Sequence, residues 1–306
     1  MKLSVIIPCK NEAGNVNKLN EKLQEVLKDI SHEIIFIDDG STDNTLAELK
    51  KLNDIKIISF SKNFKKEAAI YAGLKYSKGD YTCIIDGDLQ QDPKYLLKMI
   101  NELDKGEFDQ VVMVNKKRKE FILNRILKKI FYKLMNIISD VDFINGASDF
   151  SMFNNLVKNA ILEMSEVNRF SKGLFSWIGF NTCYMEYDVL KRFSGKSKFN
   201  FRENLKYAFT GIIGFSIKPL KIATFFGILS SISSFVYFFI LLIKTIIVGK
   251  DVPGYASILC VILLLGGIQL ITIGILGEYL GRTYIEVKKR PIYLIKEKIG
   301  FDESLL

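Results

Sequence analysis

Two long stretches without a charged residue constrain this chain of 306 residues more than any other feature. They run from Ile222 to Ile243 and from Tyr255 to Gly277, and each is about 22 residues long. A helix needs about 20 apolar residues to cross the hydrocarbon core of a bilayer. Helices buried in soluble proteins rarely run so far without a charge, so the sequence predicts two transmembrane helices within residues 222–284.

The charges that flank these stretches predict their orientation. Lys218 and Lys221 precede the first stretch, and Lys288 to Arg290 follow the second, whereas the loop between the stretches is short and nearly neutral. Cytoplasmic flanks of membrane helices carry an excess of lysine and arginine. We therefore expect a multi-pass protein of the cell membrane with both termini and its N-terminal part in the cytoplasm.

The four cysteines and the single histidine argue against two kinds of site. Cys9, Cys83, Cys183 and Cys260 lie far apart and form no C-x-x-C pair, and His32 is the only histidine. A disulfide framework or a zinc site needs closer or more numerous ligands. Buried thiols are the better interpretation.

The net charge of +9 is concentrated in two basic segments, from Lys116 to Lys133 and from Lys191 to Lys206. Nucleic acid could bind such segments in principle. Basic residues beside a membrane helix are more simply explained by anionic headgroups or a lipid phosphate. We expect membrane lipids, and not nucleic acid, as partners.

Before the first apolar stretch, short runs rich in valine and isoleucine alternate with helical patterns. The predicted strands are Leu3–Ile7, Glu33–Ile37, Ile55–Ser59, Tyr81–Ile85 and Gln110–Val114, and the predicted helices are Val16–Leu27, Thr45–Leu52, Glu67–Tyr76 and Pro93–Leu103. This alternation predicts an α/β domain with a mostly parallel, Rossmann-like sheet covered by helices. The expected division is this α/β domain at 1–199, a juxtamembrane helix at 200–221, the two spans at 222–284 and a cytoplasmic tail at 285–306.

One further segment has the pattern of an amphipathic helix. Apolar residues recur at helical spacing from Phe121 to Ile138, with Arg125, Lys128, Lys129 and Lys133 between them. Such a helix either lies in the membrane interface or packs on the domain as an ordinary surface helix. The nearby spans favour the interface.

Two acidic clusters follow predicted strands. Asp38 and Asp39 come after the second strand, and Asp86 and Asp88 come after the fourth. Ligands bind beyond the carboxyl ends of the strands in sheets of this kind. The sequence has no glycine-rich loop that could bind phosphate groups. Carboxylates would repel a diphosphate ligand, so we expect a divalent cation to bind between the carboxylates and such a ligand. Oxygen ligands favour Mg²⁺ or Mn²⁺.

The order of several motifs resembles a known family. They are V-I-I-P-C-K-N-E at Val5–Glu12, I-D-D-G-S-T-D at Ile37–Asp43, D-G-D-L-Q at Asp86–Gln90, N-R-F-S-K-G-L-F-S-W-I-G-F at Asn168–Phe180, R-F-S-G-K-S-K-F at Arg192–Phe199 and G-I-L-G-E-Y-L-G-R at Gly274–Arg282. The first three resemble inverting family-2 glycosyltransferases with the GT-A fold. The later ones are similar to the branch that uses polyprenyl phosphates, which includes bactoprenol glucosyltransferases and, more distantly, dolichol-phosphate mannose synthases.

The resemblance implies roles for residues on the donor side. The nucleotide sugar would contact Pro8, Glu12, Asp38, Asp39, Ser41 and Asp86. Asp86, Asp88 and Gln90 would lie at the metal on the diphosphate. From the residues alone, Asp38–Asp43 is also compatible with a capped turn that leads into a helix, and the D-x-D segment with a surface turn.

The resemblance also implies roles on the acceptor side. Asp149 and Arg192 would be catalytic, and Lys116, Arg125, Arg192 and Lys198 would bind the acceptor phosphate, with Lys116 in place of a usual arginine. A phosphate monoester has a second pKa of about 6 and is largely dianionic at neutral pH. A general base is then not required, so Asp149 either acts as one, orients the acceptor or has a structural role.

The expected reaction is an inverting transfer, first from UDP-glucose, otherwise from UDP-GlcNAc or another sugar nucleotide, onto undecaprenyl or another polyprenyl phosphate for cell-envelope glycosylation. Family resemblance also implies a homo-tetramer. A processive polysaccharide synthase is disfavoured, because the only tryptophan, Trp177, is not part of a Q-x-x-R-W segment. A membrane scaffold without catalysis is the remaining alternative.

Overall fold

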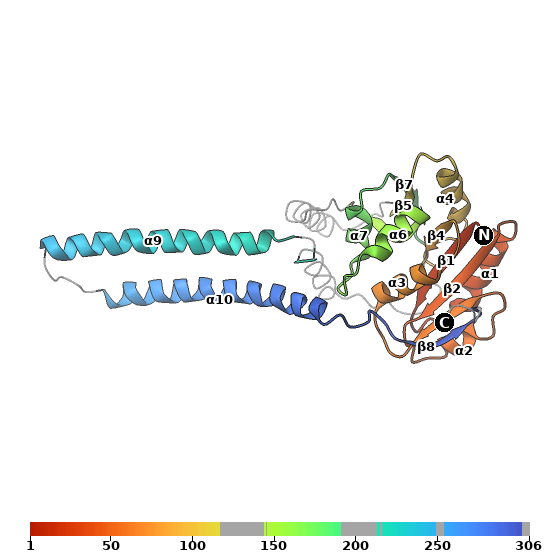
Figure 1. The fold of residues 1–306 in the computed structure, drawn as a ribbon, viewed down its shortest axis with the longest axis horizontal. Helices are drawn as coiled ribbons and strands as arrows, with labels where there is room; N and C mark the ends of the chain where they lie inside the picture. Colours follow the sequence, from red (N-terminus) through yellow and green to blue (C-terminus); the bar gives the residue numbers. More distant parts are fainter. Residues whose placement is uncertain (117–143, 145, 191–212, 215, 249–253, 302–306) are drawn as a thin grey trace.

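The computed structural model describes residues 1–116, 144, 146–190, 213–214, 216–248 and 254–301. It consists of an α/β domain from which two long helices project as a hairpin (Figure 1). The predicted helix at Phe121–Ile138 lies outside the described residues. So does the predicted juxtamembrane helix at 200–221, apart from its last residues.

The domain is built on one sheet of eight strands in the order β7-β5-β6-β4-β1-β2-β3-β8. The strands are β1 (Leu3–Cys9), β2 (His32–Asp38), β3 (Lys56–Phe60), β4 (Tyr81–Ile84), β5 (Gln110–Asn115), β6 (Ala147–Asn154), β7 (Thr182–Tyr187) and β8 (Ile295–Ile299). Only β6 and β8 run antiparallel to their neighbours. The mostly parallel α/β sheet is therefore confirmed, and the five predicted strands agree with β1–β5 to within two residues.

Helices cover both faces of the sheet. One face is covered by α1 (Val16–Leu27), α2 (Thr45–Leu49) and α4 (Tyr95–Asp104), and the other by α3 (Lys66–Tyr76), α6 (Asn155–Glu163) and α7 (Ser171–Trp177). Successive residues of a strand point to opposite faces, so Val5 and Ile7 join the first layer and Ile6 joins the second. Because both faces are covered, the central strands are largely apolar, as parallel strands usually are.

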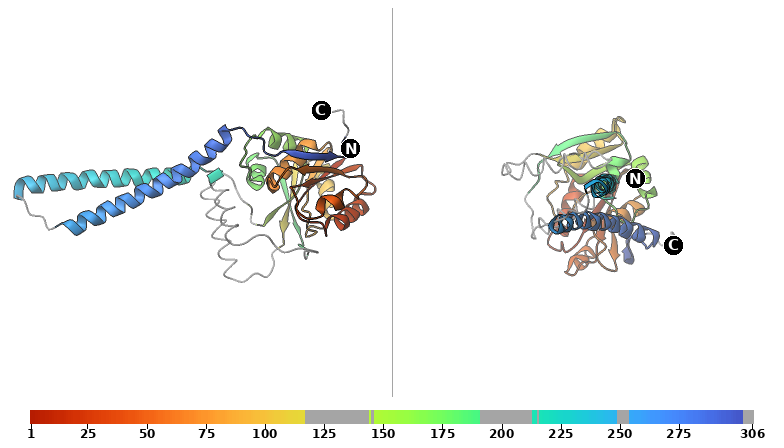
Figure 2. Two further views of the ribbon diagram at one scale, coloured as in Figure 1. Left: turned by 90° about the horizontal axis from the view of Figure 1, so that it is seen from below. Right: turned by 90° about the vertical axis from the view of Figure 1, so that its left-hand side faces the viewer.

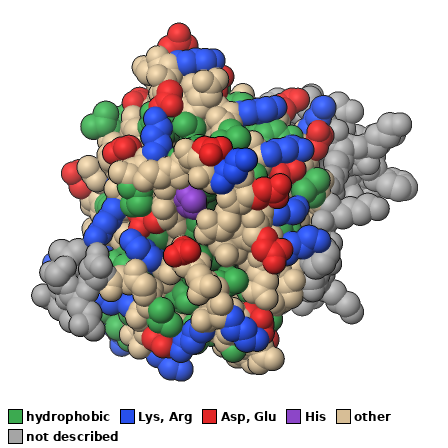
Figure 3. Space-filling model, turned by 90° about the vertical axis from the view of Figure 1, so that its right-hand side faces the viewer, with side chains coloured by type: hydrophobic (Ala, Val, Ile, Leu, Met, Phe, Trp, Pro, Cys, Tyr) green, Lys and Arg blue, Asp and Glu red, His purple; other side chains and the backbone are tan. Residues whose placement is uncertain are grey.

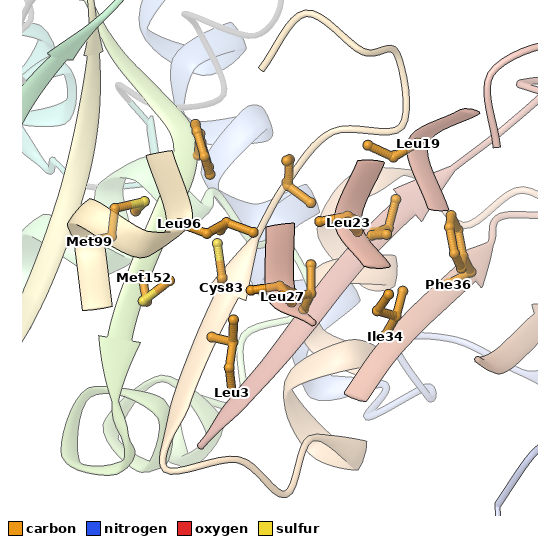
Figure 4. Close-up of a cluster of buried hydrophobic side chains, with 14 of the residues drawn as sticks. Leu3, Leu19, Leu23, Leu27, Ile34, Phe36, Cys83, Leu96, Met99 and Met152 are labelled. Carbon is orange, nitrogen blue, oxygen red and sulfur yellow. The ribbon is translucent and has the colours of Figure 1, made fainter. Parts of the chain in front are cut away.

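Figure 4 shows the larger of these two apolar layers. Leu19, Leu23 and Leu27 recur every fourth residue of α1 and are fully buried against β1 and β2. Met99 of α4 and Met152 of β6 lie in the same layer (Figure 4). Truncating a leucine in such a layer to alanine typically costs about 2–5 kcal/mol. This packing holds the carboxyl ends of the strands, and the side chains that follow them, in fixed positions.

The C-terminal segment differs from the expectation of a tail at 285–306. Residues Ile295–Ile299 form β8, which pairs antiparallel with β3 and completes the sheet. Just before it, the ring of Tyr293 stacks on Phe60 with 5.0 Å between centroids. The chain thus returns to its N-terminal domain after the two long helices. A strand separated from its partner by more than 200 residues leaves no local pattern that could predict the pairing.

Removing residues 291–306 is expected to lower the melting temperature of the α/β domain by about 10 °C. The deletion exposes the edge of β3 and removes the apolar contacts that Tyr293, Ile295 and Phe301 make in the second layer. Thermal denaturation of the full and shortened chains, followed by circular dichroism in detergent, measures the change. Lys296→Ala, an exposed position on β8, is the control. Equal melting temperatures for the shortened and full chains would contradict a structural role for β8.

The two long helices are α9 (Lys218–Val248) and α10 (Tyr255–Val287), and they contain the two predicted spans. Both are long and apolar enough to cross a membrane. Apolar side chains are exposed along both helices; Phe235, for example, is 64% exposed and Leu270 is 73% exposed. Figure 2 shows that both helices project from the same side of the domain. The opposite side of the domain instead carries interspersed basic and acidic side chains (Figure 3), as surfaces in water do.

Candidate active site

The sheet brings the carboxyl ends of its parallel strands to one edge. The registers pair Cys9 with Asp38 at the ends of β1 and β2, and Asn115 with Tyr187 at the ends of β5 and β7. Because β6 is antiparallel to β4, its beginning, which contains Asp149, lies at this same edge. The edge thus gathers the residues that follow β4 and those that open β6.

A cavity of about 210 Å³ opens at this edge. Its lining is mainly polar and comes from segments that are far apart in the sequence. The lining residues are Asp86, Asp88, Gln90, Gln91, Asn115, Ala147, Ser148, Asp149, Lys172, Tyr187 and Val189. Three predicted donor-side residues and Asp149 therefore share one cavity.

The turn after β4 is held by its own side chains. Gln91 accepts a hydrogen bond from the Asp86 backbone N–H (2.8 Å) and donates one to Asp86 Oδ2 (3.0 Å). Asp88 Oδ1 accepts the N–H of Gln90 (3.1 Å). A Cβ on Gly87 would lie 3.4 Å from Cys9 Cβ and 3.5 Å from the oxygen of Pro8. These are ordinary van der Waals distances, so the turn lies directly beside the end of β1.

Lys66, the first residue of α3, forms ion pairs with both Asp86 and Asp149. Its Nζ lies 2.6 Å from Asp86 Oδ1 and 2.5 Å from Asp149 Oδ2. Burial alone would lower the pKa of Lys66, but Asp149 and Asp86 outweigh it and raise that pKa well above its usual value. Burial would likewise raise the pKa of Asp149, yet Lys66 and then Lys172 leave it below its ordinary value. The Lys66 ammonium therefore lies between the side chains of Asp86 and Asp149 and contacts both.

A second lysine and a buried glutamate flank this group. Lys172, in α7, donates from Nζ to the backbone oxygen of Ala147 (3.0 Å). Glu67 accepts hydrogen bonds from the backbone N–H of Ser171 (2.9 Å) and from its hydroxyl. Burial, with a smaller contribution from Asp149, raises the pKa of Glu67 from 4.5 to about 7. Glu67 thus connects the start of α3 to the start of α7.

The raised pKa of Glu67 predicts a pH-dependent stability. The folded state binds this proton more tightly than the unfolded chain does, so stability falls as pH rises from 4.5 to about 7 and changes no further above that range. Glu67→Gln removes this contribution, and its melting temperature should change less between about pH 5 and about pH 8 than that of the parent chain. The exposed Glu21→Gln is the control. A parallel pH dependence in Glu67→Gln and the parent would refute this assignment.

The acidic pair after β2 is buried and engaged in holding loops. Asp38 accepts the N–H of Ser41 (3.1 Å) and the hydroxyl of Ser59 (2.9 Å). Asp39 accepts the backbone N–H groups of Phe64 (2.6 Å) and Lys65 (3.2 Å). Burial raises the pKa of Asp39 despite these bonds. Asp39 therefore fixes the loop that places α3, and contact of either carboxylate with a nucleoside stays a prediction.

The other predicted residues fall into three groups. Ser41 accepts the backbone N–H of Asn11 (3.0 Å), and Glu12 donates its backbone N–H to Thr45 Oγ1 (2.8 Å), so both belong to the loops beyond β1 and β2. Lys116 is exposed at the end of β5, and its backbone N–H donates to Tyr187 (3.0 Å). The acceptor-side residues outside the described part of the chain are Arg125, Arg192 and Lys198.

The cavity fits a divalent cation that is shared with a substrate. Within the described residues, no three His, Cys, Asp or Glu side chains gather as a metal cage. Asp88 and Gln90 nevertheless offer oxygens to one cavity, while the two oxygens of Asp86 contact Lys66 and Gln91. Mg²⁺ typically uses one or two carboxylates and completes its shell with substrate phosphates and water. The oxygen atoms of Asp88 and Gln90 therefore fit a cation that is bound together with a diphosphate.

Three charged residues of the site were not predicted from the sequence. Lys66 and Glu67 open a helix directly after the third strand, at the same edge as the acidic clusters. The strand-end rule was applied to acidic residues only, and extending it to the first turn of each helix could have found both. Lys172 lies inside the N-R-F-S-K-G motif but carried no assigned role.

A family model and two curated proteins match most of this chain, and all of them are named as glycosyltransferases. The model of Glycosyl transferase family 2 matches residues 4–163. The chain is 42% identical to the putative glycosyltransferase CsbB of Bacillus subtilis over 96% of this chain and 91% of that protein. It is 39% identical to the prophage bactoprenol glucosyl transferase homolog of Escherichia coli over 97% of this chain and 99% of that protein.

A solved structure, glucosyl-3-phosphoglycerate synthase from Mycobacterium tuberculosis with Mn²⁺ and UDP-glucose, is also similar. It is 15% identical, with a TM-score of 0.48, and the match covers 69% of this chain and 77% of that chain. The family match includes Asp86, Asp88 and Asp149 of the cavity, and the two relatives are matched along nearly their whole length. The chain therefore belongs to glycosyltransferase family 2 and is a glycosyltransferase with a GT-A-like fold.

Proposed function

We propose that the enzyme transfers glucose from UDP-glucose onto undecaprenyl phosphate, or another polyprenyl phosphate, at the cytoplasmic face of the cell membrane. The observation that carries this proposal is the length of the match to proteins named bactoprenol glucosyl transferases. The bactoprenol glucosyl transferase of Shigella phage SfII is 38% identical to this chain, and the alignment covers 97% of this chain and 98% of that protein. The likeness therefore includes the two apolar helices as well as the α/β domain.

On the donor side, Asp88 and Gln90 would hold Mg²⁺ or Mn²⁺ together with the diphosphate, and Asp86 lines the same cavity. The cation, when bound, neutralises the charge that develops on the leaving UDP. The nucleoside lies over the ends of β1 and β2, near Pro8, Glu12, Asp38, Asp39 and Ser41. Support comes from Gly87, whose close approach to Pro8 and Cys9 joins the D-x-D turn to that region.

On the acceptor side, a phosphate oxygen of the lipid attacks the anomeric carbon of glucose as the bond to UDP breaks. The electron pair of that bond leaves with UDP, and the configuration inverts. A dianionic phosphate needs no general base, and Asp149 is held as a carboxylate by Lys66. Asp149 therefore orients the reacting groups.

Cations offset the negative charges that meet in this site. Lys66 contacts Asp86 and Asp149, and Lys172 lines the same cavity. Without these lysines the carboxylates would repel both the diphosphate and the lipid phosphate. Lys116, Arg125, Arg192 and Lys198 complete the acceptor site in this proposal. Arginine suits it, because a guanidinium can bind two phosphate oxygens at once.

The two apolar helices keep the cavity beside the lipid substrate. The basic residues that flank them, Lys218, Lys221 and Lys288 to Arg290, favour a cytoplasmic position for the domain. UDP-sugars are then bound from the cytoplasm and the prenyl chain stays in the bilayer. We also propose a homo-tetramer, on the family resemblance alone.

The test is transfer by the purified full chain in vesicles that contain undecaprenyl phosphate. Radiolabelled UDP-glucose, UDP-GlcNAc and GDP-mannose are compared, each with Mn²⁺ and with EDTA. Label from UDP-glucose should enter the lipid phase with Mn²⁺ and not with EDTA. Label from UDP-GlcNAc in preference would replace the donor assignment, and no transfer from any donor would contradict the proposed activity.

A further inference from the structure

We infer that Glu286, near the end of α10, is a positioning residue that fastens the second apolar helix to the segment leading into α7, and so sets the distance between the active site and the bilayer. This inference rests on the proposed function, because the distance matters only if the acceptor phosphate is anchored in the membrane. The observations that carry it are contacts between parts of the chain more than 100 residues apart.

The carboxylate of Glu286 accepts several N–H groups from one short loop. Its Oε1 and Oε2 lie 3.1 Å and 3.0 Å from the backbone nitrogen of Val167, and Oε1 lies 3.1 Å from that of Asn168. Nδ2 of Asn168 is a further donor at 3.5 Å. Hydrogen bonds from N–H groups to a carboxylate are stronger than those between neutral groups. The contact therefore fixes the loop backbone itself, whatever its side chains.

Helix stability does not explain a glutamate at this position. Glu286 is the penultimate residue of α10, where the helix dipole places partial negative charge and favours lysine or arginine instead. A carboxylate there weakens the helix slightly unless something else stabilises it. The N–H groups of Val167 and Asn168 provide that stabilisation.

The loop that Glu286 contacts leads to the cavity within a few residues. Arg169 is buried, donates to the backbone oxygens of Met164 (2.6 Å) and Ile161 (3.0 Å), and lies over the ring of Tyr71 at 4.5 Å. The loop is thus firmly held on its inner side. Two residues further on, Ser171 donates to Glu67, and Lys172 lines the cavity.

The chain beyond α10 provides a second attachment, but a less direct one. It runs back to the α/β domain and enters β8 (Figures 1 and 2). There the Ser61 N–H donates to the oxygen of Leu294 (3.0 Å), and β8 pairs with β3. Several residues separate Val287 from this attachment. Without Glu286, α10 could pivot about that connection, and the bilayer would no longer be held at a constant distance from Lys172.

Hydrogen–deuterium exchange of the full chain in vesicles tests the contact directly. Glu286→Ala and Glu286→Gln are compared with Glu278→Ala, a change on the same helix at a residue that pairs with Arg282 one turn away. We expect the backbone amides of Val167 and Asn168 to exchange about ten-fold faster in Glu286→Ala, because their charged acceptor is lost. Exchange should be unchanged in Glu278→Ala and intermediate in Glu286→Gln. Equal exchange in Glu286→Ala and Glu278→Ala would overturn the inference.

Acceptor length provides the functional test. With undecaprenyl phosphate in vesicles, Glu286→Ala should lose about ten-fold in kcat, because misplacement by about 1 Å is costly. With a short-chain prenyl phosphate free in solution it should lose less than about three-fold, because that acceptor can follow the site. UDP affinity, measured by calorimetry, should stay unchanged. Equal losses with both acceptors, or loss of UDP binding in both Glu286 variants, would overturn the inference.

The two proposals fail in different ways. If the parent chain glucosylates neither acceptor, the proposed function is wrong, whereas the exchange experiment still decides whether Glu286 holds the loop. If the parent transfers glucose normally and exchange does not respond to Glu286, the proposed function stands and the positioning role is wrong.

Discussion

Replacing Asp88 by asparagine is expected to lower the rate of glucosyl transfer about 100- to 1,000-fold. Asparagine keeps the size of the side chain and an oxygen that can accept the N–H of Gln90, which bonds Asp88 Oδ1 at 3.1 Å. It removes the negative charge that the proposed cation requires. The loss should therefore come from the chemistry and from metal binding, with the fold intact.

Two measurements separate this effect from a general loss of structure. Binding of Mn²⁺ in the presence of UDP, followed by electron paramagnetic resonance, should weaken together with the rate. Asp104→Asn is the matched control, because that carboxylate contacts Lys2 and Tyr81 on the surface, away from the cavity. If Asp88→Asn kept more than about a tenth of the activity with unchanged Mn²⁺ binding, Asp88 would not be the metal ligand.

Replacing Lys66 by methionine is expected to lower kcat/KM about 100-fold. Methionine fills a similar volume but removes the ammonium that lies 2.6 Å from Asp86 and 2.5 Å from Asp149. The two carboxylates then lose their shared partner and repel both each other and the incoming phosphates. The neighbouring Lys65→Met, at an exposed position, should stay within about two-fold of the parent.

The conservative change sharpens this test. Lys66→Arg keeps the charge but presents it as a wider, planar group, so we expect part of the activity to return. Steady-state kinetics with UDP-glucose and undecaprenyl phosphate compare the variants. Full activity in Lys66→Met would show that the ion pairs with Asp86 and Asp149 are only structural.

Much of the fold was predictable because its signal is local. Helix α1 agrees with the prediction at both ends, Val16 and Leu27, since its apolar residues recur with a helical period. The strands β6 and β7 were not predicted, and β8 pairs with β3 across both long helices. Pairings of that kind depend on tertiary contacts that a single sequence does not display.

Site residues that directly follow a parallel strand could be predicted from the sequence. Contacts between side chains that are far apart in the sequence could not. Asp86 and Asp88 follow a parallel strand, so the edge of the sheet could be named in advance. Lys66 contacts Asp149 over a sequence separation of 83 residues, and no motif links the two. Asp39 was assigned to the nucleoside from family resemblance, yet its carboxylate also holds the loop before α3, which only the structure reveals.

The most direct test of the account is the chemical identity of the lipid product. The full chain in vesicles is given UDP-glucose and undecaprenyl phosphate with Mn²⁺, and the extracted lipid is analysed by mass spectrometry and by proton NMR of the anomeric position. The account predicts undecaprenyl phosphate carrying one hexose, in the β configuration, and no such product from Asp88→Asn. An unmodified lipid, or glucose attached in the α configuration, would contradict it.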